Sequence, residues 1–282
     1  ATTRGSSIDI EGFAVLRDVP AGSPGLVSLE IDPAALAHST GPERGFSDVR
    51  IVDREGRQVP YLVEQCVTPL VVDLPFTRQQ PGADLENGRQ VSEYRLTLPY
   101  GSLPAPRLIL TTSARVFVRR VTLGRLRAAD RSHRDTWFET LADAAWSHDD
   151  VATPAPPRTI PMVVVDDTNL VLRVEEGDNA PLPLTSAKLM LPGYRLRFYR
   201  AADEHLRLAY GRPDLGPPRY DIELLASDVL GRVATDVRAS AETPARASSG
   251  VPFISPQVFW VVLGIAVVVL MGMAIRLVGK GT

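Results

Sequence analysis

The sequence predicts an all-β ectodomain, made of two β-sandwich or jelly-roll domains, that is followed by one C-terminal transmembrane α-helix. Three observations lead to this prediction. Many short segments alternate apolar and polar residues, which is the period of a half-buried strand. The 24 prolines and 21 glycines are spread between these segments, where they act as turn signals. One long apolar run without charged residues lies near the C-terminus.

The alternating segments are short and separated by turn residues, which is typical of a sandwich or jelly roll. Residues 48–53 and 58–63 read as a hairpin, and Gly56 between them suits a tight turn because glycine readily adopts positive φ. Residues 32–36 read as a turn or the start of a helix. The other expected strands are 8–19, 25–31, 94–98, 108–111, 116–123, 169–174, 186–191, 194–199, 205–210 and 219–225.

The chain is expected to have five parts. Residues 1–103 and 104–230 are expected to form the two β-sandwich domains. Residues 231–256 are rich in Ala, Ser, Thr, Arg and Pro, which predicts a flexible juxtamembrane tether. Residues 257–279 are the predicted transmembrane helix, and residues 280–282 the short cytoplasmic tail.

The membrane anchor is predicted from an apolar run at residues 258–275. At about 1.5 Å per residue, a helix of this length covers roughly 27 Å, close to the roughly 30 Å of a hydrocarbon core. Trp260 lies near its start, where aromatic residues favour the headgroup boundary. Arg276 and Lys280 follow the run and favour a cytoplasmic C-terminus. Gly264 and Gly272 are eight residues apart and would let a second helix approach closely, although such composition is also ordinary for a membrane span.

Composition excludes several classes of function. The 31 basic and 33 acidic side chains give a formal net charge of −2, so we expect no nucleic-acid partner. Cys66 is the only cysteine, which excludes an intrachain disulfide and a cysteine-based zinc cluster. We expect Cys66 to be an unreactive, half-buried thiol. None of the four histidines forms a short metal-ligand pair, and we predict no cofactor.

Three groups of residues together resemble the bacterial DUF3999 family, whose function is unknown. The groups are 46–53 with Gly56 and 59–61, then 172–174 with 177–182, then 208–211 with 218–221. The resemblance covers most of the chain, from about residue 10 to the anchor, and it supplies no catalytic residues. It implies a single-pass protein of the bacterial inner membrane, with a periplasmic ectodomain and a cytoplasmic C-terminus. It also implies a multi-spanning membrane protein as partner.

Two further expectations accompany the resemblance. Residues 108–225 look like a galactose-binding-like jelly roll, a sandwich whose loops bind sugars or proteins. The chain begins with polar residues at Ala1, and the resemblance implies that a signal peptide was cleaved before them. The alternative is a tail-anchored protein in the cytosol.

Acidic residues near two strand ends are candidate calcium ligands, because calcium prefers oxygen ligands and jelly-roll loops often hold it. They are Asp166, Asp167, Glu176 and Asp178. Ordinary turn chemistry explains the same residues without an ion. The metal prediction for the chain is therefore none, with these four residues as the candidates to test.

A polar loop before an aromatic pair is the candidate for exposed contacts. Its residues are Arg131, His133 and Arg134, followed by Trp137, which could stack on a sugar or pack in the core. The sequence has no Gly-x-Ser-x-Gly elbow, no phosphate-binding glycine loop and no His-Glu-x-x-His helix. We therefore predict a non-enzymatic accessory or scaffold subunit at the lipid bilayer. The alternatives are a module that binds envelope polysaccharide and a hydrolase acting on envelope glycans.

Overall fold

The structure, a computed structural model, describes residues 3–79, 90–129 and 135–244. The predicted all-β class is confirmed, since strands dominate these residues and form three sheets. The named helices in the described chain are short: α1 (Pro33–His38), η1 (Pro42–Arg44), η2 (Asp221–Leu225) and α2 (Ala226–Gly231). Within the described residues, no helix is long and apolar enough to cross a membrane. The predicted span at 257–279, with Gly264 and Gly272, lies outside the described residues.

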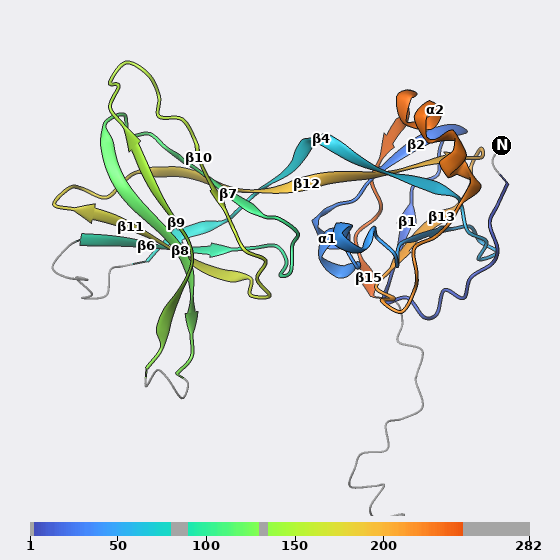
Figure 1. Cartoon of the computed structure of the whole chain (residues 1–282), viewed down its shortest axis with the longest axis horizontal. Helices are drawn as coiled ribbons and strands as arrows, with labels where there is room; N and C mark the ends of the chain where they lie inside the picture. The colour runs from blue at the N-terminus through green and yellow to red at the C-terminus, as the bar shows by residue number, and fades with distance from the viewer. Residues whose placement is uncertain (1–2, 80–89, 130–134, 245–282) are drawn as a thin grey trace, which may run out of the picture. The chain divides into compact units, whose positions relative to one another are not determined.

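The first sheet has the order β15-β1-β13-β3, and the third has the order β5-β6-β11-β8-β9 (Figure 1). Strands of the first sheet are β1 (Val15–Val19), β3 (Arg50–Val52), β13 (Leu206–Tyr210) and β15 (Thr243–Pro244). Strands of the third sheet are β5 (Phe76–Arg78), β6 (Gln90–Thr97), β8 (Phe117–Arg127), β9 (Trp137–His148) and β11 (Asn169–Gly177).

The second sheet has the order β10-β7-β12-β2-β14, and β4 also pairs with β12. Its strands are β2 (Gly25–Glu30), β4 (Tyr61–Asp73), β7 (Arg107–Thr112), β10 (Arg158–Pro161), β12 (Leu184–Arg200) and β14 (Thr235–Val237). The pairs of β12 with β7, β4 and β2 are all antiparallel, whereas β14 runs parallel to β2. Strand β12 is therefore the central strand of this sheet, and β4 runs beside it (Figure 1).

Strands from both sides of the expected boundary at 103 and 104 share sheets. Leu29 in β2 pairs with Leu196 in β12, and Leu96 in β6 pairs with Leu170 in β11. All four side chains are buried in one continuous hydrophobic cluster. One compact unit extends to Thr243.

Three local expectations can be compared directly with the structure. The turn at Gly56 is confirmed, since its φ is 75° and the N–H of Val59 donates to the carbonyl of Ile51. The helix start is also confirmed, because Asp32 caps α1 by accepting from the N–H of Ala35. The strand expected at 219–225 is wrong: residues 221–225 form the 3-10 helix η2. In η2 only Ile222 is buried, against Leu62 and Val229, so the segment lacks the alternating buried face of a strand.

The first part of the expected tether is incorporated into the sheets. Residues 235–237 form β14, in which Asp236 pairs with Ser28. The N–H of Ser240 then donates to the carbonyl of Asp18 in β1. These bonds hold the segment up to residue 242 against the first two sheets.

Candidate functional site

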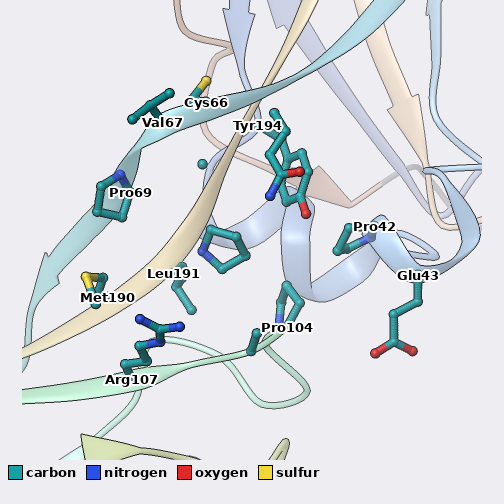
Figure 2. Close-up of a pocket in the computed structure, with 14 residues that line it drawn as sticks. Pro42, Glu43, Cys66, Val67, Pro69, Pro104, Arg107, Met190, Leu191 and Tyr194 are labelled. Carbon is teal, nitrogen blue, oxygen red and sulfur yellow. The ribbon is translucent and has the colours of Figure 1, made fainter. Parts of the chain in front are cut away.

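A pocket of about 640 Å³ opens where β4 runs beside β12 (Figure 2). This volume is within the usual range of ligand-binding pockets, roughly 300–1,000 Å³. Its walls come from β4, from β12, from η1 and from the segment that enters β7. The lining residues are Pro42, Glu43, Gln65, Cys66, Val67, Pro69, Pro104, Ala105, Arg107, Met190, Leu191, Pro192, Gly193 and Tyr194.

An irregularity in β12 forms the floor of this pocket. The pairing with β4 shifts register between Leu191 and Gly193. Buried positions fall on odd residue numbers up to Gly193 and on even numbers from Leu196 onward. Such a β-bulge exchanges the two faces of a strand, and it allows both halves of β12 to bury apolar side chains. A Cβ on Gly193 would lie 2.5 Å from the carbonyl oxygen of Thr68, so glycine permits the close approach of β4.

About half of the pocket surface is apolar. Prolines at 42, 69, 104 and 192 contribute to it, together with Leu191 and Met190. Beside them, Val67 is fully exposed, and Val63 and Val71 on the same face of β4 are also exposed. Apart from β12, β4 pairs with no other strand among the described residues. An exposed apolar face on a strand with an open edge is typical of a site that binds another protein.

Two oppositely charged side chains lie at the pocket, Arg107 and Glu43. Both are exposed, and neither has a hydrogen bond or ion pair to any residue that the structure describes. Figure 2 shows them on opposite sides of Pro104. The side chains of Gln65 and Tyr194 also form no hydrogen bond within the described chain. The pocket therefore presents four polar groups that remain available to a ligand.

Cys66 lines the same pocket and is half-buried. Burial raises the pKa of its thiol above the ordinary value. The thiol is therefore protonated at neutral pH, when it is a poor nucleophile. This agrees with the expectation of an unreactive, half-buried cysteine.

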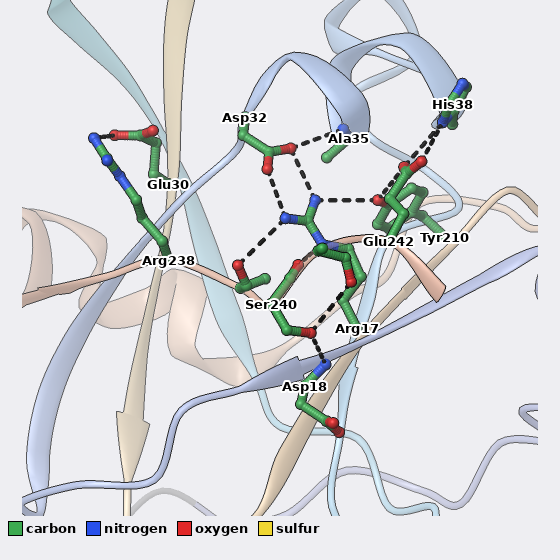
Figure 3. Close-up of polar contacts among 12 residues, drawn as sticks. Arg17, Asp18, Glu30, Asp32, Ala35, His38, Tyr210, Arg238, Ser240 and Glu242 are labelled. Atoms are coloured by element: carbon green, nitrogen blue, oxygen red, sulfur yellow. Dashed lines mark hydrogen bonds and ion pairs between the residues drawn. The ribbon is translucent and has the colours of Figure 1, made fainter. Parts of the chain in front are cut away.

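A polar cluster holds the C-terminal part of the described chain against β1, β13 and α1 (Figure 3). Arg17 in β1 is buried; its Nη1 and Nη2 donate to Asp32 and its Nε donates to the carbonyl of Ser240. Glu242 accepts from the hydroxyl of Tyr210 at 2.6 Å, and Nδ1 of His38 lies 2.9 Å from the same oxygen. The chain is thus tied to β1, β13 and α1 immediately before residue 243.

This polar cluster is connected along the chain to two residues that line the pocket. The His38 ring makes an edge contact with Tyr100, with centroids 5.2 Å apart. Pro42 and Pro104, which line the pocket, each follow one of these rings by four residues. Residues 38–42 and 100–104 therefore connect the polar cluster to the pocket wall along the chain.

The four candidate calcium ligands are engaged in separate local contacts or exposed. Asp166 accepts from the hydroxyl of Ser102, and Asp167 accepts from the N–H of Asn169. Glu176 is buried and accepts from Arg119 at 2.7 Å and from the N–H of Leu182. Asp178 lies in the exposed turn after β11. No group of three or more His, Cys, Asp or Glu side chains in the described part of the chain could hold a metal.

Of the residues predicted to bind carbohydrate, Trp137 lies in the described chain. Trp137 begins β9 and is half-buried. Arg131, His133 and Arg134 lie outside the described residues. The polysaccharide-binding and hydrolase alternatives stay predictions.

Sequence reasoning missed Arg107, Glu43, Gln65 and Tyr194. They come from four separate segments, and none belongs to a recognisable motif. The only local signal was Pro192-Gly193, which reads as a turn but marks a bulge.

No family model, no curated protein and no solved structure matches the chain. The resemblance to DUF3999 therefore stays a prediction.

Proposed function

We propose that this chain is a membrane-anchored, periplasmic accessory subunit that binds a multi-spanning membrane protein through the pocket between β4 and β12. In this proposal its three sheets belong to two β-sandwich domains, one of them galactose-binding-like, and residues 257–279 form the anchor. The chain supports its partner by binding, without catalysing a reaction.

One observation carries the proposal: the exposed valines of β4 adjoin a pocket whose four polar side chains have no partner in the described chain. Exposed apolar surface that adjoins polar groups available for hydrogen bonds is typical of protein-binding sites. A membrane anchor would add to the affinity, because confining both proteins to one bilayer raises their effective concentration.

Site-specific photo-crosslinking in intact membranes tests the proposal. A photoreactive amino acid at Val67 of the full chain should form an adduct with a membrane protein that mass spectrometry identifies. The matched control is Val233, which is equally exposed but does not line this pocket. Equal adducts at both positions, or none at Val63, Val67 and Val71, would refute a binding role for this surface.

A further inference from the structure

We propose that the ligand of the β4–β12 pocket is an extended peptide segment of the partner, with an acidic and a basic side chain on either side of apolar residues. This inference rests on the proposed function and specifies the chemistry of the bound segment. It follows from the charges, the apolar lining and the available hydrogen-bonding groups of the pocket.

The charges give the first requirement. Arg107 carries a planar guanidinium with five N–H donors, which matches the two oxygens of a carboxylate. Glu43 offers a carboxylate to a basic side chain. Because both lack an ion-pair partner in the described chain, a ligand with both charges gains two new pairs without breaking existing ones. A ligand with a single charge would leave one of them unpaired.

The lining between the charges gives the second requirement. Pro104 lies between Arg107 and Glu43 in Figure 2, and the apolar residues Leu191 and Pro192 line the same pocket. A proline has no backbone N–H, so this wall donates few hydrogen bonds. It favours apolar side chains in the middle of the ligand.

Two uncharged groups give the third requirement. The Gln65 amide can donate and accept hydrogen bonds, and so can the Tyr194 hydroxyl. A peptide backbone offers both kinds of group at every residue except proline, and an extended backbone leaves them unpaired within the peptide. An extended peptide therefore satisfies Gln65 and Tyr194, whereas a helix would keep these groups within its own hydrogen bonds.

The test uses synthetic peptides and the full chain in detergent micelles. Each fluorescent peptide has blocked ends and carries Glu and Lys separated by two, three or four residues of Pro, Val and Leu. Both orders of the two charges are included, because the pocket does not fix the direction of the peptide. Binding is measured by fluorescence anisotropy at low salt and at physiological salt.

At least one of these peptides should bind, and replacing its Glu by Lys should weaken binding by about tenfold, the loss expected for one charge-assisted pair. In the Arg107→Glu variant the preference should reverse, so that the Lys-for-Glu peptide binds better than the original. The matched control is Arg95→Glu, which makes the same charge change at an exposed arginine of β6 outside the pocket. It should keep the original preference.

Three outcomes would overturn the inference: no peptide binds, the Arg107→Glu and Arg95→Glu variants behave alike, or the preference does not reverse. The crosslinking experiment separates this failure from failure of the proposed function. If Val67 still forms its adduct with a membrane protein, the accessory role stands and only the chemistry of the bound segment is refuted.

Discussion

Arg17 binds Asp32 through two parallel hydrogen bonds, with Nη1 2.8 Å from one carboxylate oxygen and Nη2 2.6 Å from the other. Arg17 is only 4% exposed. Its Nε reaches the carbonyl of Ser240, so the same guanidinium joins β1, the start of α1 and the C-terminal end of the described chain. The hydrogen bond to Ser240 thus links segments that are more than two hundred residues apart in the sequence.

Replacing Arg17 should destabilise the protein strongly, because it leaves the largely buried carboxylate of Asp32 without its cation. We expect Arg17→Met to lower the free energy of unfolding by about 3–5 kcal/mol. The measurement is urea unfolding of the full chain in detergent, followed by tryptophan fluorescence. The control is Arg238→Met, where the arginine is 79% exposed and pairs with Glu30 at 3.3 Å; it should cost less than about 1 kcal/mol. Similar losses for both variants would contradict the central role of Arg17.

The contribution of Asp32 should depend on pH. Burial opposes ionisation of Asp32, but the hydrogen bonds from Arg17 and from the N–H of Ala35 outweigh it, and its pKa lies below the ordinary value. A lowered pKa stabilises the folded state above the unfolded pKa, about 3.9, and this contribution is lost as pH falls towards the folded pKa.

The test compares wild type with Asp32→Asn, which keeps a capping side chain for α1. The wild type should be more stable at pH 7, and the difference should shrink steadily below about pH 4. Urea midpoints measured across this range would show it. A difference that stays constant with pH would contradict the argument.

We expect Gly193 not to tolerate even a methyl side chain. An added Cβ would lie 2.5 Å from the Thr68 carbonyl oxygen and 3.2 Å from the Cys66 Cβ. We expect Gly193→Ala to cost about 1–3 kcal/mol and to alter the pocket, since β4 must move away from β12. The control is Gly216→Ala, where nothing lies within 4 Å of the added Cβ. Thermal unfolding of both variants tests this prediction. A Gly193→Ala variant as stable as the wild type would show that β4 can move away from β12 without loss of stability.

The Cys66 thiol should react slowly with iodoacetamide. Because burial raises its pKa, less thiolate is present at pH 8 than in a free cysteine peptide, whose pKa is about 8.5. The rate should increase with pH and should rise to that of the peptide when the chain is unfolded in urea. Mass spectrometry of the alkylated protein gives the rates. A folded protein that reacts faster than the peptide would indicate an activated thiol.

The sequence predicts the fold class because alternation is a local property. The buried positions of β11 at Leu170, Leu172 and Val174 follow from it directly. The sequence pattern predicts two strands, 186–191 and 194–199, in place of β12, since Pro192-Gly193 usually marks a turn. In the structure one strand continues through it, because β4 and the bulge allow a proline and a glycine within the sheet.

The pairing of strands is harder to predict from one sequence than the fold class. Nothing local in Leu29 indicates that it pairs with Leu196, and nothing in Leu96 indicates Leu170. Strands of the expected domains 1–103 and 104–230 pair with each other, which the local pattern does not indicate. The candidate site depends on the same long-range pairing, because Arg107 and Glu43 line one pocket only after β4 lies beside β12.

The continuity of β12 has a consequence for how the protein unfolds. At one end the strand is bonded to β7 and at the other to β2, with β4 along the middle. Because β4 pairs with β12 on both sides of the bulge, loss of β4 removes hydrogen-bonding partners from both halves of β12. Loss of β4 should therefore destabilise the other strands of this sheet, and we expect the sheet to unfold on heating in one cooperative transition.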